Sequence, residues 1–337
     1  MAILYQSKIK CLEMRFHTNY YTFKADSNFA LGEQMGKAFK KEAKQALEAN
    51  RENWERKLEI ARKLLEVSEN NFPKYVDELK GYAKGAEVDF LDFWTVSLET
   101  DVDIDEDFRC TNIITNSGKL MAHNEDHDDV GLENSVCVVR KEINGLGTLE
   151  VFYYNTVGGC SMGVNSFGFA QSMNTLNGVR KMIGIPRNFC GRAIQDAAEP
   201  LAEIEKLKNL PRVSGYNHNI IDPSGKILNV ELTSQGCELT FPNSPFVHTN
   251  HCLLGDLGKT KPRDDHGTVS RLKVVKKLTK NKMTTAEVKE MMNEGGVMNE
   301  RTIAKMMVDF ERMVAEIWLL REKDLGWVEY PLDFVKS

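Results

Sequence analysis

The sequence predicts an α+β fold in which helices flank antiparallel sheets, and two contrasts along the chain lead to this prediction. The chain from Phe29 to about Glu66 is rich in Ala, Lys, Glu and Leu, with apolar residues at helical spacing, whereas short β-rich runs separated by Gly and Asn begin at Cys110. The strands also come in runs and do not alternate one by one with helices. That order favours antiparallel sheets over a doubly wound parallel sheet.

Helices dominate the expected structure before Cys110. A long amphipathic helix or a helix pair is expected over residues 29–66, where apolar residues recur at helical spacing. A turn at 70–73 follows, and a second helical stretch ends near Gly85. The first part of the chain is therefore expected to be mainly helical.

Short strands and turns dominate the chain from Cys110 onward. Strands are expected at 110–115, 119–123, 136–141, 148–156, 161–164 and 168–172. A helical interlude over 188–210 follows. Further strands are then expected at 217–221, 227–232 and 237–241. The turn residues at 222–225 predict a hairpin between the first two of these.

Two later segments complete the list of expected elements. Thr284 to Glu287 has the pattern of a capping box, which predicts that a helix begins there. The segment 302–320 fits a helix in its first half and a strand in its second. We interpret it as two strands around Glu311 and Arg312.

Composition limits the classes of function. The chain has 337 residues, 42% of them hydrophobic and 28% charged, which is an ordinary globular composition with a net charge of −5. Because there is no basic excess, neither nucleic acid nor an anionic membrane surface is an expected partner. No apolar run approaches the length of a membrane span, and the first residues lack a signal-like apolar region. The sequence therefore predicts a cytoplasmic protein.

The seven cysteines are an odd set without a Cys-x-x-Cys pair, which argues against a disulfide framework or a zinc knuckle. Most of them are expected to be small buried hydrophobic residues. Cys110 differs by its place, since it begins a predicted strand directly after the acidic run 101–107. If the bond before Cys110 were cut, its thiol and its freed α-amine would be a nucleophile and a base on one residue.

Amide cleavage needs a nucleophile, a group that takes its proton and donors for the oxyanion. Cys110 would attack, and its α-amine, with a pKa of about 8, would accept the thiol proton. Asp126 lies one strand and turn later, where it could hold that amine. Asn174 and Asn250 offer neutral side-chain amides that could donate hydrogen bonds to the oxyanion.

Several short motifs follow one another along the chain in a characteristic order. They are Cys110-Thr111, Asn124-x-Asp126, Asn165 to Gly168 leading to Asn174, Gly215 to Asn217, Asp222 to Gly225, Glu231, His248 to His251 and, upstream, Pro73 to Tyr75 with Glu78 to Ala86. In this order and spacing, the chain resembles the acyl-coenzyme A:isopenicillin N acyltransferase-like group of N-terminal-nucleophile (Ntn) hydrolases, peptidase family C45. It is more distantly similar to the choloylglycine hydrolases.

The resemblance implies a four-layer αββα sandwich of two antiparallel sheets between helices. It also implies a precursor that cuts itself between Arg109 and Cys110, giving a helical chain 1–109 and a catalytic chain 110–337 that stay packed as one domain. A substrate would then form a thioester on the cysteine, which water or an amine resolves. No cofactor is expected, and a homo-oligomer is left open.

The same resemblance assigns roles to single residues. Cys110 matches the nucleophile, Asp126 the acid that positions the amine, Asn250 the side-chain oxyanion donor and Asn174 the second asparagine of the choloylglycine relatives. The expected partner is a small amide, with an acyl-CoA or an amine acceptor as a second partner. Residues expected to touch it are Thr111, His123, Asn124 and His248. One departure is His123, since the choloylglycine relatives carry an arginine two or three residues before the aspartate.

Two alternatives remain at the level of the sequence. His123, Asp126 and His127, with His248 or His251, could bind zinc in a metal-dependent hydrolase. Against this, the segment 123–127 is predicted as strand and turn, whereas His-x-x-x-His sites usually lie on a helix. The other alternative is an uncleaved binding protein without enzymatic activity, in which Cys110 stays inside the chain.

Overall fold

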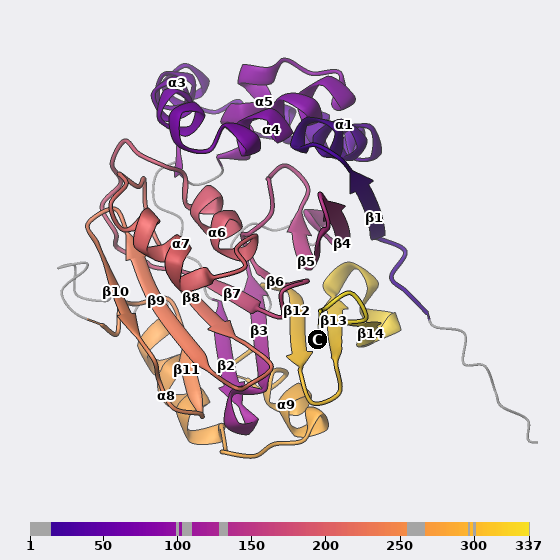
Figure 1. The fold of residues 1–337 in the computed structure, drawn as a ribbon, viewed down its shortest axis with the longest axis vertical. Coiled ribbons are helices and arrows are strands. Elements are labelled where there is room, and N and C mark those ends of the chain that lie inside the picture. Colours follow the sequence, from indigo (N-terminus) through magenta and orange to yellow (C-terminus); the bar gives the residue numbers. More distant parts are fainter. Residues whose placement is uncertain are drawn as a thin grey trace, which may run out of the picture.

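Two β-sheets lie face to face between layers of helices in the computed structural model (Figure 1). It describes residues 15–98, 101–102, 110–127, 134–254, 267–295, 297–298 and 301–336. From one outer face to the other, the order is helices, sheet, sheet, helices. The predicted α+β class and four-layer αββα sandwich are therefore confirmed.

The strands of the two sheets are consecutive along large parts of the chain. The larger sheet contains, in spatial order, β1 (Tyr20–Ala25), β4 (Val136–Ile143), β5 (Leu146–Tyr153), β6 (Met162–Asn165), β7 (Ala170–Thr175), β8 (Tyr216–Ile221), β9 (Ile227–Thr233) and β10 (Gly236–Thr240). The smaller sheet contains β11 (Phe246–His248), β2 (Thr111–Thr115), β3 (Leu120–Asp126), β12 (Thr302–Asp309), β13 (Val314–Leu319) and β14 (Val328–Pro331). Neighbouring strands are antiparallel, except that β1 runs parallel to β4.

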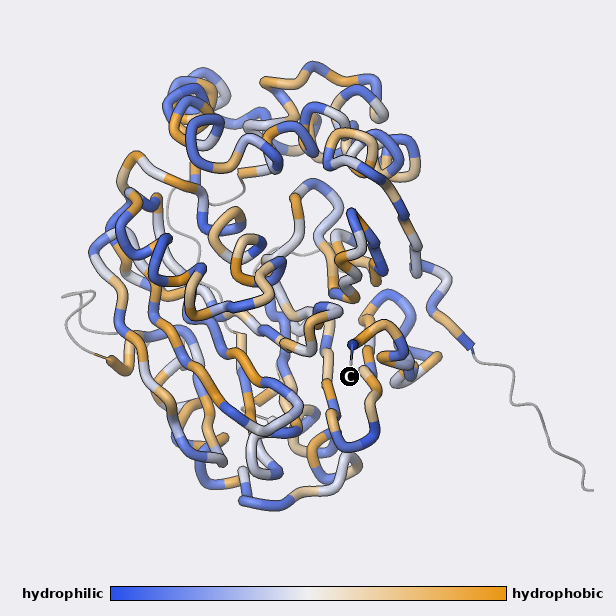
Figure 2. Tube along the Cα trace, in the orientation of Figure 1, coloured by the Kyte–Doolittle hydropathy of each residue, from blue (hydrophilic) through white to orange (hydrophobic). Residues whose placement is uncertain are grey.

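The helices cover the outer faces of the sheets. On the larger sheet lie α1 (Asn28–Ala38), α2 (Lys40–Ala49), α3 (Trp54–Asn71), α4 (Pro73–Ala86), α5 (Phe90–Ser97), α6 (Arg187–Gln195) and α7 (Pro200–Leu207). On the smaller sheet lie α8 (Thr268–Leu278) and α9 (Thr285–Met291). Orange and blue segments alternate along the helices in Figure 2, because each helix turns its apolar side toward the core and its polar side toward water.

A separate apolar core fills much of the space between the sheets. Val136 and Val138 of β4 and Met306 and Val308 of β12 belong to it. It does not extend to the end of the sheets where Cys110 lies, because there the facing side chains are polar. The candidate site lies at this polar end of the space between the two sheets.

Helices α1 and α4 pack so closely that glycine is required at their contact. A Cβ atom at Gly32 or Gly36 of α1 would overlap backbone atoms of α4, and one at Gly81 or Gly85 of α4 would overlap backbone atoms of α1. The four glycines thus let two helix backbones touch.

Most of the predicted elements are confirmed. The 29–66 region forms α1, α2 and α3. The hairpin at 222–225 joins β8 to β9. In the capping box, Thr284 Oγ1 accepts from the Glu287 N–H and Glu287 accepts from the Thr284 N–H. The two strands around Glu311 and Arg312 are β12 and β13.

Other elements differ from the expectation. The N-terminal part also contributes the strand β1, and three further elements that were not predicted are β11, α8 and β14. Of the acidic run 101–107, only Asp101 and Val102 are among the described residues, and Arg109 lies outside them.

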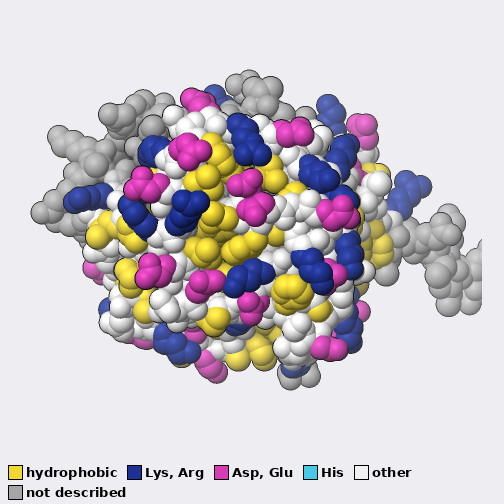
Figure 3. All heavy atoms as spheres, turned by 90° about the horizontal axis from the view of Figure 1, so that it is seen from above, with side chains coloured by type: hydrophobic (Ala, Val, Ile, Leu, Met, Phe, Trp, Pro, Cys, Tyr) yellow, Lys and Arg dark blue, Asp and Glu magenta, His cyan; other side chains and the backbone are white. Residues whose placement is uncertain are grey.

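Charges of both signs are interspersed on the surface of the helical layer seen in Figure 3. Many are paired, as in Lys37 with Glu33 and Lys63 with Glu59. This face therefore carries no field of a single sign that would attract a polyanion. Within the described ranges, every helix is too short or too polar to cross a membrane.

Candidate active site

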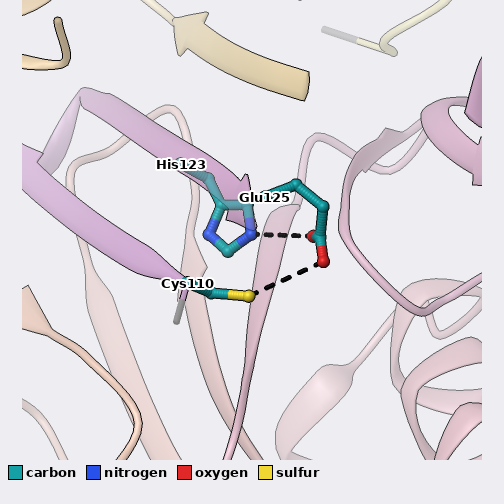
Figure 4. A group of neighbouring side chains, drawn as sticks. All are labelled: Cys110, His123 and Glu125. Atoms are coloured by element: carbon teal, nitrogen blue, oxygen red, sulfur yellow. Dashed lines mark hydrogen bonds and ion pairs between the residues drawn. The ribbon is translucent and has the colours of Figure 1, made fainter. Parts of the chain in front are cut away.

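Cys110 lies directly before β2, an inner strand of the smaller sheet, and its side chain is buried. Its Sγ atom is 3.6 Å from Oε1 of Glu125, and Oε2 of Glu125 is 3.1 Å from Nε2 of His123 (Figure 4). His123 and Glu125 are two residues apart on β3, so the strand directs both side chains to the same face. The three side chains form one buried cluster between the sheets.

The surroundings of Cys110 keep its thiol protonated. Burial raises the pKa of the Cys110 thiol well above its ordinary value, and the carboxylates of Glu125 and Asp126 raise it further. The Asp126 backbone N–H and the Arg271 guanidinium oppose that shift. A nearby base is therefore needed to make the thiol nucleophilic.

Arg271 of α8 joins the predicted catalytic residues. Its Nη1 lies 3.3 Å from the Cys110 carbonyl oxygen, 3.4 Å from Thr111 Oγ1 and 3.6 Å from Asp126 Oδ2. Its Nη2 donates to Asn250 Oδ1 at 2.9 Å. Cys110, Asp126 and Asn250, far apart in sequence, thus meet at one buried guanidinium.

Sequence reasoning missed Arg271, although it leaves a signal. Leu272 and Val275 form the inward face of α8, and Arg271 is a charged residue on that same buried side. A charged side chain on an apolar helix face is rare unless it is paired. Because the helix itself was not predicted, the signal could not be used.

Asp126 is held from a second side as well. The Thr302 hydroxyl donates to Asp126 Oδ1 at 2.5 Å, next to a bulge in the pairing of β12 with β3. The bulge places Thr302 opposite Asp126. The carboxylate is therefore fixed between β12 and α8, next to the start of β2.

The two predicted oxyanion donors differ in what they bind. Asn250 Nδ2 donates to the Thr175 carbonyl at 3.0 Å, so that the end of β7 and the segment after β11 are tied together. Asn174 Oδ1 accepts from Asn219 Nδ2 at 3.0 Å. The Asn174 Nδ2 group, in contrast, is buried and without a partner in the described part of the chain.

Further polar side chains line the space between the sheets near Cys110. Asn112 accepts from the Ser172 hydroxyl at 2.7 Å, and Asn219 accepts from Asn229 at 2.9 Å. Buried polar atoms that lack a partner among the described residues are Asn112 Nδ2, His123 Nδ1, Asn217 Oδ1 and Asn229 Oδ1. Since burying unpaired polar groups is costly, such a concentration is typical of a site that binds polar ligands or water.

The residues expected to touch substrate are spread over two faces of the smaller sheet. His123 lies beside the thiol. Thr111 faces Arg271 on the opposite face. Asn124 also points there, since its Nδ2 donates to the carbonyls of Met292 and Val297. His248 Nε2 is 3.1 Å from Glu231.

The Glu231 carboxylate also accepts the backbone N–H groups of Leu253 and Leu254. The contacts of Glu231 with His248 and with these two N–H groups therefore order the segment that carries Asn250.

A metal site would use different residues from those of the sequence alternative. Cys110 Sγ, His123 and Glu125 offer ligand atoms within 4.8 Å of one another, and thiolate, imidazole and carboxylate all bind zinc. Asp126 instead binds Thr302 and Arg271, and the His127 ring packs near Tyr153. The geometry thus groups Glu125, which sequence reasoning had missed, with His123.

The comparison by sequence identifies similar proteins. Residues 114–319 match the family model described as acyl-coenzyme A:6-aminopenicillanic acid acyl-transferase. The acyl-coenzyme A:6-aminopenicillanic-acid-acyltransferase 40 kDa form of Emericella nidulans is 25% identical over 205 residues. That alignment covers 58% of this chain and 57% of the relative, so the match spans little more than half of the relative's length.

Solved structures with a similar fold include a Caenorhabditis elegans N-acylethanolamine-hydrolyzing acid amidase ortholog and a Clostridium perfringens conjugated bile acid hydrolase. The first has a TM-score of 0.42 at 13% identity and covers 60% of this chain and 92% of its own. The second has a TM-score of 0.42 at 13% identity and covers 68% of this chain and 93% of its own. At this level of similarity, no residue role or substrate is transferred from them.

Proposed function

Because the chain belongs to the acyl-coenzyme A:6-aminopenicillanic acid acyl-transferase family, we propose that it transfers or hydrolyses acyl groups at amide bonds with Cys110 as nucleophile. The observation that carries the proposal is the contact of one guanidinium, that of Arg271, with Cys110, Asp126 and Asn250. These are three of the residues that sequence reasoning had selected for catalysis.

The chain matures by cutting the bond between Arg109 and Cys110. The cut gives chains 1–109 and 110–337, and it frees the α-amine of Cys110. Because the pKa of the buried thiol is raised, the thiol needs a base to remove its proton, and the freed α-amine is that base. The pKa of the amine, about 8, suits proton transfer near neutral pH. Asp126, next to the start of β2, positions the amine when it is protonated.

Turnover then proceeds through a thioester. The α-amine takes the thiol proton, and the thiolate attacks the substrate carbonyl carbon. Asn250 and Asn174 donate hydrogen bonds from their Nδ2 groups to the oxyanion, and the unpartnered Nδ2 of Asn174 supports this role. As the C–N bond breaks, the leaving amine takes the proton from the ammonium of Cys110.

The acceptor decides the outcome of the second step. Water attacking the thioester gives hydrolysis, whereas an amine gives acyl transfer, and both return the thiol. The substrate class is a small N-acyl or aminoacyl compound with a linear amide bond, with an acyl-CoA as alternative donor. His123 contacts the substrate, and the polar side chains between the sheets bind its polar groups. Thr111 faces Arg271 on the other side of β2 and has no part in this contact.

Replacing the nucleophile tests the proposal. The Cys110→Ala protein should stay a single band on a denaturing gel and release no amine from N-acyl amino acids, β-alanyl amides or penicillin-type amides. Wild-type protein should give two bands, with Cys110 as the first residue of the larger fragment. Chelator should change neither result.

Cys237→Ala serves as the matched control, because Cys237 is a partly exposed cysteine at the edge strand β10. It should be cut and should be active like the wild type. An active Cys110→Ala protein, or a wild-type protein that stays intact and inactive, would contradict the proposed function.

A further inference from the structure

We propose that Glu125 is the base that activates Cys110 for self-cleavage, before the α-amine exists. This inference rests on the proposed function. In the intact chain the nitrogen of Cys110 is part of a peptide bond, and an amide nitrogen is not basic. The first cut therefore needs a proton acceptor other than the one that serves later turnover.

Glu125 lies at the thiol in the required position. Its Oε1 is 3.6 Å from Cys110 Sγ, and both side chains are buried between the sheets (Figure 4). The strand pairing of β2 with β3 fixes this approach, because Thr111 lies opposite Asn124 and the neighbouring side chains point to the other face. The contact therefore depends on a sheet register and not on a loop.

Two further groups hold the carboxylate toward the thiol. The Tyr153 hydroxyl donates to Oε1 at 3.0 Å, and His123 Nε2 lies 3.1 Å from Oε2. The other nearby carboxylate, that of Asp126, binds Thr302 and Arg271. Geometry thus separates the two acids: Glu125 faces the sulfur, and Asp126 faces the guanidinium.

The proposed step balances within the chain. Glu125 takes the proton from Cys110 Sγ as sulfur bonds to the carbonyl carbon that precedes Cys110. The carbon–nitrogen bond to Cys110 then breaks, and the nitrogen takes the proton back from Glu125 to become the α-amine. Water hydrolyses the resulting thioester, its proton returns to sulfur, and the thiol and the new carboxyl end are formed.

The test follows the cut in freshly synthesised full-length protein. Glu125→Gln keeps the size of the side chain and one acceptor oxygen but cannot take a proton, so the cut should slow by about 10²–10⁴-fold, as for the loss of a general base. Glu125→Asp keeps a carboxylate and should restore part of the rate. Glu316→Gln is the matched control, because Glu316 is a buried carboxylate of β13 in the same sheet, and it should be cut at the wild-type rate.

Thermal unfolding of each variant separates chemistry from folding. The inference requires that Glu125→Gln unfolds close to the wild-type temperature and is still cut slowly. A Glu125→Gln protein that is cut at the wild-type rate overturns the role of Glu125 and leaves the proposed function standing. If Glu125→Asp and Glu125→Gln are equally slow and equally destabilised, the role of Glu125 is structural. A wild-type chain that is never cut defeats the proposed function instead.

Discussion

At the scale of the residue, burial controls the acid–base behaviour of this protein. The Cys110 thiol is buried and lies near the carboxylates of Glu125 and Asp126, so it holds its proton until a base takes it. Whether the thiol loses its proton therefore depends on where a base lies relative to the sulfur. The Glu125 carboxylate, 3.6 Å from sulfur, meets this condition in the intact chain, and the α-amine of Cys110 would meet it after the proposed cut.

Burial of His218 predicts a loss of stability in acid. Burial lowers the pKa of His218 from 6.5 to about 3, so the unfolded chain binds a proton in a range where the folded protein does not. Between these two values the free energy of unfolding should fall as the pH falls, by up to about 1.4 kcal/mol per pH unit. Urea denaturation at about pH 7, 6 and 5 measures this slope.

The variant His218→Leu isolates the contribution of this residue. Because leucine does not titrate, the difference in unfolding free energy between wild type and variant should change with pH by the slope given above. A constant difference would show that His218 does not contribute. His251, whose pKa burial lowers to about 4, contributes to the wild-type slope in the same direction and is common to both proteins.

Candidate catalytic residues could be predicted where the residue type and the order of residues along the chain are informative. Cys110, Asp126 and Asn250 could be chosen from the sequence, and the structure brings them to one guanidinium. Glu125 was not chosen, although strand alternation would have placed it on the same face as His123. Its importance depends on the register of β2 with β3, which the sequence does not specify.

At the scale of the element, the two faces of β3 carry side chains that make different contacts. His123 and Glu125 point between the sheets toward the thiol, whereas Asn124 and Asp126 point toward the outer helices. One seven-residue strand thus positions both acids of the site. Moving its register by one residue would exchange the two faces and abolish both contacts.

The contact of α1 with α4 predicts a strong effect of a single methyl group. Gly81→Ala would place a Cβ atom against the backbone of α1 at Phe29, and backbone atoms cannot move aside as a side chain can. We expect a loss of unfolding free energy of about 1–3 kcal/mol, as for overpacking in a core. Urea denaturation of the uncut Cys110→Ala background measures it.

A matched control lies on the surface. Gly145 has open space where a Cβ atom would lie but a positive φ of 80°, so Gly145→Asn tests a glycine without the packing conflict. It should cost less than Gly81→Ala. Equal losses for the two variants would mean that the helix contact is not the cause.

Elements were predictable where local signals determine them. The hairpin after β8 and the capping box of α9 follow from their own residues. The strand β1 was missed, because its partner β4 is more than a hundred residues away. Helix α8 was missed because its many lysines hide a narrow apolar face.

At the scale of the whole molecule, residues on the two sides of the proposed cut are closely joined. Arg192 of α6 is buried and lies 3.0 Å from Glu78 of α4. The Tyr75 hydroxyl of α4 donates to Asp196 at 3.1 Å. A large shared core of α1, α4 and the outer face of the larger sheet surrounds these contacts. The α+β class was predictable from the order of helices and strands, and the four-layer sandwich from the family resemblance, but these pairings were not.

The shared core predicts that the two fragments stay together after the cut. Size-exclusion chromatography without denaturant should give one peak that contains both bands, because separating them would expose the core between helices and sheet. Arg192→Met should weaken this association, since it leaves the buried Glu78 carboxylate without its partner. Separate elution of the wild-type fragments under these conditions would contradict the expectation.

The parallel pairing of β1 with β4 has one more consequence. It makes residues 20–25 the edge of a sheet whose other strands all follow Cys110. An uncut molecule can rebuild this sheet within a single chain, whereas a cut molecule must first find its lost partner by diffusion. Recovery from denaturant should then depend on protein concentration. The uncut precursor could thus refold as a single chain, whereas the matured protein could refold only if two separate chains meet again.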